Sequence, residues 1–345
     1  MMRFLMACSL VVALAGGEAS AADPSLDALY AAAKDEKPLT WYQVPLPQAV
    51  GEEIATAFAQ QYPGLVVQTQ RNPAQTLFEK IGQEIKADAP GADLFTSSVV
   101  NHLATLKQQG KLLRFTPNAA ATLTDAIPGV KGIDPDGYYY STVIDDVGIV
   151  YNTKLLKAGD GPKSYQDLLN PAWRGKLAVP NPAASGTFGA LTVSLHKTYG
   201  KAYFDALAKN DAMVVRSLPD ALNVVQSGER MLAITTLPFA LAAKQRGQPV
   251  DVIYPTDGIL ISICPTGILS KTLSPNSAKL FMEFLLSRNV SEIVARAFNE
   301  PLHDGVAVPE GMKHLSTLKV ILPTEAEMAS TLPVVIEEWR DAFGM

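Results

Sequence analysis

The sequence predicts an α/β fold made of two lobes, each with a mostly parallel sheet covered by helices. Short β-branched segments alternate with amphipathic segments of helical period, the order expected of parallel strands joined by crossover helices. Of the 345 residues, 48% are hydrophobic, so the chain can bury a large core. That length is also more natural for two lobes than for one.

The N-terminal segment is expected to be a signal peptide, residues 1–21, and not part of the fold. Arg3 precedes an apolar stretch at residues 4–15, and Ala19-Ser20-Ala21 forms a small-residue cleavage site. The apolar stretch is too short for a membrane anchor, which needs about 20 residues. We therefore expect a soluble exported protein, with mature residues beginning at 22 or 23.

Cysteine content and charge narrow the class of protein further. Removal of the signal peptide leaves only Cys264, so no intramolecular disulfide is possible, and its apolar surroundings predict a buried, unreactive thiol. The net charge is −5 and no Lys/Arg-rich run is present. Nucleic acid and anionic membrane surfaces are therefore not expected as partners.

The first part of the mature chain has a regular β-α-β-α-β-α pattern. Strands are expected at residues 39–44, 65–70 and 92–98, and helices at 49–62, 75–86 and 99–110. Gly110 is expected to end the third helix, since glycine readily adopts the left-handed conformation found there.

The pattern resumes after a proline-punctuated region at 115–137. Residues 138–152 are β-branched and aromatic, and predict one or two extended strands. Further strands are expected at 176–180, 213–217 and 230–236, helices at 274–300 with a break at Asn289, and a closing helix at 334–343.

The stretch NPAASGTF, residues 181–188, lies where a strand gives way to a helix. Leu191, Leu195 and Tyr199 recur at helical spacing, so the helix is expected to begin near Gly186 or Thr187. One interpretation is that Ser185 caps this helix. Alternatively, the first amides of the helix face outward and bind an anion. The stretch alone does not decide between the two.

Small polar residues and two arginines follow the predicted strands. In open α/β sheets, ligands bind outside the carboxyl ends of the strands. The candidate ligand-binding residues at those ends are Gln43, Arg71, Ser97, Ser98, Ser185, Gly186, Thr187, Arg216, Thr235 and Thr236. Each arginine taken singly is better explained by a surface ion pair, but together the set predicts an anion site.

Catalytic motifs are missing from the sequence. It contains no G-x-S-x-G, H-E-x-x-H, Walker or G-x-G-x-x-G pattern, and its four histidines have no ligand spacing. Asp145 and Asp146 are adjacent in a predicted strand, so they point to opposite faces, one solvated and the other hydrogen-bonded. We expect no enzyme, no catalytic residues, no metal and no cofactor. A secreted hydrolase or transferase is the alternative from a different class.

Distinctive segments follow one another from Leu39 to about Ala297. They read GADLFTSS, GIVYNTKLL, SYQDLLNPAWRGKLAVPNPAASGTFGAL, VVQSGERMLAITT, GQPVDVIYPTDGI and NSAKLFMEFLLS. In this order they resemble bacterial extracellular solute-binding proteins of ABC importers. The subgroup is the one that contains ferric-ion, thiamine, polyamine and aminophosphonate or phosphosugar binders.

The resemblance implies the type II periplasmic-binding-protein fold, whose two lobes close on a solute in the cleft between them. The segments VIDDVGIVYN and YPTDGILISI would cross between the lobes. Lobe 1 is expected to comprise residues 22–138 and 258–305, and lobe 2 residues 139–257 and 306–345. The resemblance also implies a periplasmic monomer that delivers a small solute to a cognate permease and ATPase in the inner membrane.

Three kinds of solute remain open at this stage. An anion, meaning a carboxylate, phosphonate or phosphate ester, suits the arginines and the Ser185–Thr187 amides and is the one we favour. A cation such as thiamine or a polyamine would need Trp41 or Tyr42 for stacking and Asp93, Asp146 or Asp257 for charge, although Trp41 is expected in the core. Ferric members of the family hold iron through adjacent tyrosines where this chain has Thr235-Thr236, so ferric ion is not expected.

Overall fold

The computed structural model describes residues 25–125, 127 and 134–345. The predicted signal peptide lies outside the described residues. The strands are β1 (Leu39–Gln43), β2 (Val67–Arg71), β3 (Leu94–Thr96), β4 (Leu112–Leu113), β5 (Tyr139–Asn152), β6 (Leu177–Pro180), β7 (Met213–Val215), β8 (Leu232–Thr236), β9 (Val250–Ile253), β10 (Ile259–Leu269) and β11 (Val320–Ile321). The helices are α1 (Leu26–Ala33), α2 (Gln48–Gln61), α3 (Ala74–Lys86), α4 (Val100–Gln108), α5 (Gly186–Tyr199), α6 (Ala202–Lys209), α7 (Leu218–Ser227), α8 (Leu237–Gln245), α9 (Pro275–Leu285), α10 (Arg288–Arg296) and α11 (Glu325–Phe343).

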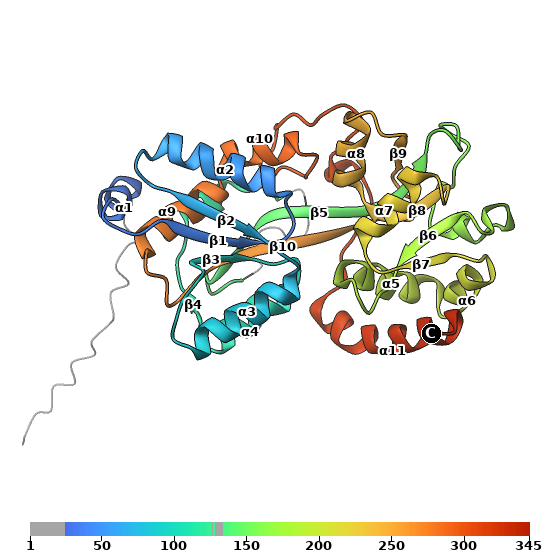
Figure 1. Ribbon diagram of the computed structural model, residues 1–345, viewed down its shortest axis with the longest axis horizontal. Helices are drawn as coiled ribbons and strands as arrows, with labels where there is room; N and C mark the ends of the chain where they lie inside the picture. The colour runs from blue at the N-terminus through green and yellow to red at the C-terminus, as the bar shows by residue number, and fades with distance from the viewer. Residues whose placement is uncertain (1–24, 126, 128–133) are drawn as a thin grey trace, which may run out of the picture.

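Two groups of parallel strands are joined by two long antiparallel strands. The order in the sheet is β2-β1-β3-β10-β5-β8-β6-β7. β1 is parallel to β2 and β3, and β6 is parallel to β7 and β8, whereas β10 and β5 are antiparallel to each other. Figure 1 shows β5 and β10 running from one half of the molecule to the other. The predicted two-lobe α/β fold and its two crossing segments are therefore confirmed.

The first crossing is one continuous strand, β5, and not two. Its β-branched and aromatic residues suit a half-buried pleated surface. The pairing with β10 runs from Val147 opposite Leu260 to Tyr139 opposite Gly267, with a shift in register between Cys264 and Pro265. Proline has no amide hydrogen to donate to the ladder, which explains the irregularity there.

Helices cover both faces of the sheet in each lobe (Figure 1). In the first lobe, α1 and α2 pack with α9 and α10 on one face, while α3 and α4 lie on the other. In the second lobe, α7 and α8 occupy the first face, and α11 packs on α5 and α6 on the opposite face. The lobe boundaries given from the sequence stay a prediction.

Two helix boundaries differ from the sequence prediction. The helical segment 274–300 breaks at Leu286 and Ser287, not at Asn289, because the Ser287 hydroxyl accepts a hydrogen bond from the Val290 amide and starts a new helix. The closing helix begins at Glu325 and not at residue 334. The Thr324 side chain and Glu327 form a capping box there, and the helix continues through Pro333.

Two predictions about buried residues are confirmed. Cys264 has no solvent exposure, and burial raises the pKa of its thiol, so it stays protonated at neutral pH. Trp41 is also fully buried, with its ring 5.3 Å from that of Phe281 in an edge-on arrangement. In the part of the chain that the structure describes, no helix combines the length and apolar character that a membrane span requires.

Candidate functional site

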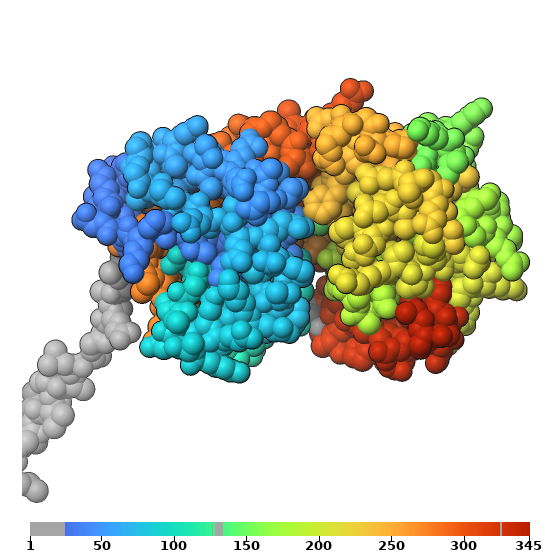
Figure 2. Space-filling view, in the orientation of Figure 1, coloured from blue at the N-terminus to red at the C-terminus, as the bar shows by residue number. Residues whose placement is uncertain are grey.

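A cavity of about 590 Å³ lies between the two lobes. The first lobe contributes residues 98–101, at the start of α4, and the second contributes Gly186, Thr187 and Ala190, at the start of α5. Residues 261–263 of the crossing strand β10 and the N-terminal part of α11 complete the wall. Figure 2 shows the surfaces of α3, α4 and α11 facing each other across a notch.

The cavity lies between the N-termini of two helices, one from each lobe. The first amides of an α-helix have no carbonyl four residues earlier to bond. In α4 these amides belong to Val100 and Asn101, and in α5 to Gly186 and Thr187. All four residues line the cavity. Both helix ends carry partial positive charge, so their arrangement favours a negative group between them.

The two lobes approach each other closely at these helix ends. A Cβ atom placed on Gly186 would lie 3.7 Å from Val99 Cγ2, an ordinary van der Waals separation. Glycine therefore leaves the α5 amides open to the cavity, while Val99 of the first lobe lies directly opposite.

The two predicted serines after β3 have different roles. Ser98 lines the cavity, and its carbonyl accepts a 3.5 Å hydrogen bond from Ser262 Oγ on β10. Ser97 is fully buried, and its hydroxyl accepts from the Val99 amide at 3.0 Å while bonding His102 Nδ1 at 3.0 Å. Burial lowers the pKa of His102 to about 4, so the imidazole is neutral and holds Ser97 in place. Ser97 therefore shapes the turn that presents Ser98.

Ser185 caps α5. Its backbone is extended and its hydroxyl accepts a hydrogen bond from the Phe188 amide at 3.3 Å. The helix begins at Gly186, as predicted. The cap interpretation is confirmed for the Ser185 hydroxyl, whereas anion binding by the neighbouring amides of Gly186 and Thr187 stays a prediction. The two interpretations of this stretch are compatible.

Gln43 and the two arginines lie outside the wall of this cavity. Gln43 is fully buried and closes a turn through two 3.1 Å hydrogen bonds with the backbone of Leu46. Arg71 is exposed and donates from Nε to the Leu46 carbonyl at 2.8 Å, and Arg216 is exposed after β7. Within the described ranges neither arginine forms an ion pair, so the surface pairs considered from the sequence are not observed there.

The two threonines at the end of β8 are buried. Thr235 donates from Oγ1 to the Leu218 carbonyl at 2.6 Å and so joins β8 to α7. The Thr236 hydroxyl has no hydrogen-bond partner among the described residues, although the side chain is buried. Thr236 precedes α8 without capping it through its side chain.

Asp145 and Asp146 are adjacent in β5 and therefore point to opposite faces of the sheet. The prediction that one of them is solvated was wrong, because both residues are half-buried. Asp145 lies opposite Ser262 and Asp146 opposite Ile261. Burial raises the pKa of Asp145 to about 7, although Arg71 acts in the opposite direction. Burial, together with Asp145 and Glu300, raises the pKa of Asp146 well above its usual range. Sequence reasoning did not place Glu300 here, because it lies more than 150 positions away along the chain.

Most of the residues proposed for a cationic solute serve the fold instead. Trp41 Nε1 donates to Thr96 Oγ1, and the Tyr42 hydroxyl donates to Glu84, each at 2.8 Å. Asp93 accepts from the Thr40 amide at 2.7 Å. Asp257 accepts from the Tyr165 amide at 2.8 Å and from the Tyr199 hydroxyl at 2.9 Å. In the ranges that the structure describes, no cluster of three or more His, Cys, Asp or Glu side chains is placed to hold a metal ion.

Sequence reasoning missed two parts of the cavity wall. One is the pair of amides at the start of α4, since Val100 and Asn101 carry no distinctive side-chain signal. The other is α11, whose N-terminal part lies before Pro333 in a segment that was not predicted to be helical. The apolar spacing of Met328, Leu332 and Val335 was the available signal for this helix.

Comparison with known sequences gives a match to one protein family. The family described as bacterial extracellular solute-binding protein matches residues 89–324. An uncharacterized protein of Haemophilus influenzae is 23% identical over 65% of this chain and 66% of its own length. A putative 2-aminoethylphosphonate-binding periplasmic protein of Salmonella paratyphi A is 27% identical over 53% of this chain and 54% of its own length. The chain thus spans between about half and two thirds of these relatives.

Solved structures with the same fold cover nearly the whole chain. Iron-bound HitA from Pseudomonas aeruginosa has a TM-score of 0.71 at 22% identity, covering 88% of this chain and 99% of that protein. The periplasmic binding protein AfuA from Actinobacillus pleuropneumoniae, with fructose-6-phosphate bound, has a TM-score of 0.72 at 22% identity. The match covers 89% of this chain and 99% of that protein. At this identity the likeness shows a shared fold.

Proposed function

The chain belongs to the bacterial extracellular solute-binding proteins, and from that premise we propose that it captures a small organic anion between its lobes. The anion is a carboxylate, a phosphonate or a phosphate ester. The protein then delivers it from the periplasm to the permease and ATPase of an ABC importer, without transforming it. The observation that carries the proposal is the pair of helix N-termini, one from each lobe, whose first amides line one cavity.

The amides can supply the affinity that such a receptor needs. A hydrogen bond to a charged group contributes on the order of 1.5–3 kcal/mol. The amides of Val100, Asn101, Gly186 and Thr187 could together support micromolar binding after the costs of association. Because each lobe holds only half of these donors, the bound anion favours the closed arrangement.

The arginines act in this proposal as charges near the site. Arg71 follows β2 in the first lobe and Arg216 follows β7 in the second, both outside the wall of the cavity, and both are exposed. Exposed positive groups around a cleft raise the local concentration of anions and speed their association. Mutation of either arginine would then slow association and make it less sensitive to salt, while the closed complex depends mainly on the amides.

The other solutes receive less support from the site. Trp41, Tyr42, Asp93 and Asp257 are engaged inside the fold, so a stacked cation has no aromatic partner from this set. The position expected for iron-binding tyrosines holds Thr235 and Thr236, and Thr235 is hydrogen-bonded to the backbone. The relative named as a putative 2-aminoethylphosphonate-binding protein and the AfuA structure with fructose-6-phosphate bound are in line with an anionic solute.

A thermal-shift and calorimetry screen tests the proposal. Phosphate, acetate, methylphosphonate and sugar phosphates form the anionic set, and thiamine, spermidine and ferric chloride form the competing set. We expect an anion to raise the melting temperature, since a ligand that binds only the folded state stabilises it by mass action. Stabilisation by a cation alone, or consumption of a ligand at enzymatic rates, would show that the proposal is wrong.

A further inference from the structure

We propose that the solute carries an apolar body beside its anionic group, and that the N-terminal part of α11 binds this body. The inference rests on the proposed function, because it starts from the anionic group held at the start of α4 and α5. It adds a chemical class, an amphipathic organic anion, and assigns α11 as the part of the chain that selects it.

The first argument is the chemistry of the cavity wall. α11 and the segment before it contribute Leu322, Pro323, Met328, Ala329 and Leu332. Across from them lie Val99, Val100, Ile261 and Ile263. Among the described side chains that line the cavity, none belongs to Asp, Glu, Lys or Arg. A wall of this composition gains free energy when apolar surface replaces water.

The second argument is the size of the cavity. A volume of 590 Å³ holds on the order of 20 waters at about 30 Å³ each. A bare anion such as phosphate or acetate would fill only a small part of it. The volume falls within the range of about 300–1,000 Å³ that is typical of sites for larger small molecules. The space beyond the helix amides therefore fits an additional apolar group.

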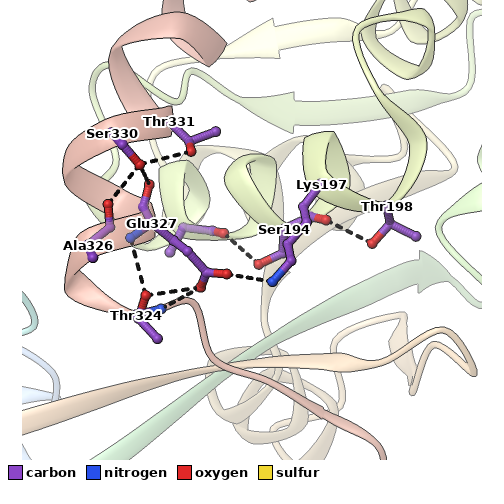
Figure 3. A network of polar contacts seen from close by, with 9 residues as sticks. Ser194, Lys197, Thr198, Thr324, Ala326, Glu327, Ser330 and Thr331 are labelled. Atoms are coloured by element: carbon purple, nitrogen blue, oxygen red, sulfur yellow. Dashed lines mark hydrogen bonds and ion pairs between the residues drawn. The ribbon is translucent and has the colours of Figure 1, made fainter.

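The third argument is that α11 is fixed to the helix that supplies the amides. Figure 3 shows the network at its N-terminus, where Lys197 of α5 forms an ion pair with Glu327 and Glu327 also completes the capping box of Thr324. Near the cavity, a Cβ atom on Gly189 would lie 3.0 Å from Leu332 Cδ1, so the two helices touch. Anionic group and apolar body are thus positioned by one rigid pair of helices.

The occupant is a small solute because the apolar wall is continuous with the anion site. The same cavity contains Ser98, Gly186 and Thr187 at one part of its wall and the α11 side chains at another. It lies between the lobes, where Val99 and Gly186 are in near contact. Its uncharged side chains and the positive ends of two helices complement a molecule with one negative group and one apolar part.

Calorimetric titration with a homologous series tests the inference in the intact mature protein. Methyl-, butyl- and hexylphosphonate share one head group, and acetate, butyrate and hexanoate provide a second series. We expect affinity to rise roughly fourfold for each methylene, which corresponds to about 0.8 kcal/mol, until the cavity is filled. Equal affinity along both series would show that the cavity wall does not bind an apolar group. The proposed function as an anion receptor would be unaffected.

Two leucine substitutions on α11 test whether this helix contacts the apolar body of the solute. Ala329→Leu fills part of the cavity, and we expect it to weaken hexylphosphonate about tenfold or more while methylphosphonate is unaffected. Ala326→Leu is the matched control, since Ala326 lies one turn earlier, is exposed and does not line the cavity. Circular dichroism and the melting temperature of the free protein verify that both variants fold.

Three results would contradict the inference. If Ala326→Leu and Ala329→Leu weakened hexylphosphonate binding equally, α11 would not contact the apolar body. Hexanol binding as tightly as hexylphosphonate would show that the anionic group is not required, and would also refute the proposed function. Tight binding of methylphosphonate with no binding of hexylphosphonate would refute the apolar body alone.

Discussion

The two faces of the long sheet are built differently. On one face a single core runs through both lobes, from Trp41 and Phe281 in the first to Leu237 and Ala240 in the second. The opposite face has two separate cores. One contains Tyr42, Phe95 and Leu103 of the first lobe, and the other contains Phe188, Leu191 and Trp339 of the second lobe.

The cavity lies where the second face is interrupted. Its walls come from α4, which packs on the first of the two separate cores, and from α5 and α11, which pack on the second. The comparison teaches that one face holds the lobes together, whereas the other leaves room between them for a ligand. Substitutions in the continuous core should therefore change the free energy of unfolding. Substitutions at the cavity between the two separate cores should change the affinity for the ligand.

The largest expected effect is on the continuous face. Phe281→Ala removes a buried ring that contacts Trp41 and Phe58 edge-on, at centroid distances of 5.3 and 5.1 Å. We expect a loss of about 3–5 kcal/mol in the free energy of unfolding. Denaturant titration followed by fluorescence and circular dichroism measures this loss. If the core really joins the lobes, both probes should shift together, and separate transitions would argue against a continuous core.

The next effect concerns the cavity between the two separate cores. Gly186→Val places a branched side chain beside Val99 and in front of the α5 amides. We expect the anion found in the screen to bind about tenfold to a hundredfold more weakly, which corresponds to the loss of one hydrogen bond to a charged group. The melting temperature without ligand should change little.

Gly82→Val on α3 is the control for that variant. A Cβ atom there meets nothing within 4 Å, and Gly82 does not line the cavity. Gly82→Val introduces the same side chain in place of a helical glycine and should retain full affinity. If both variants lost affinity equally, the α5 amides would not be the ligand contact.

A smaller effect separates the cap from the ligand contact at Ser185. Ser185→Ala removes the hydrogen bond to the Phe188 amide, so we expect a loss of about 1 kcal/mol in unfolding free energy with affinity unchanged. Ser287→Ala removes the equivalent cap of α10, far from the cavity, and provides the reference value. Calorimetry beside denaturation of the free protein measures both. Reduced affinity with unchanged stability would instead make the Ser185 hydroxyl a ligand.

The smallest effect concerns pH and the crossing strand. The pKa of Asp145 is raised from 3.8 to about 7, so the folded protein holds this proton more tightly than the unfolded chain does. Its contribution to stability is therefore complete below pH 4 and is lost as the pH rises from about 4 to 7. Because Asp145 is half-buried and not fully enclosed, we expect only part of the stability difference implied by this pKa shift to appear in the melting temperature.

Asp145→Asn isolates that contribution. The variant lacks the titrating group, so its melting temperature should fall less than that of the unaltered protein between pH 5 and pH 8. Melting curves at matched ionic strength measure the difference. Parallel curves for the two proteins would mean that Asp145 ionises at its ordinary pKa in the folded state.

The sequence by itself determined the features that depend on local periodicity. Alternating strand and helix patterns predicted mostly parallel sheets covered by helices, and the β-branched run at 138–152 predicted one or two extended strands. The family resemblance implied that this segment crosses between the lobes. The residues around Gly186 predicted where α5 begins, because helix caps and glycine act through their nearest neighbours. Ser98, Gly186 and Thr187, three of the candidates named from the sequence, line the cavity, and their part in binding a ligand stays a prediction.

Only the tertiary structure decided which of these strand ends share one cavity. Ser97 and Thr235, like Ser98, are hydroxyl residues at the end of a predicted strand. Their hydroxyls instead form hydrogen bonds inside the fold, that of Ser97 with His102 and that of Thr235 with the Leu218 carbonyl. α11 closes the cavity through Lys197 and Glu327, which are 130 positions apart in the chain. A helix with an internal proline persists there because its packing on α5 outweighs the local penalty, and such long-range contacts leave no periodic trace in the sequence.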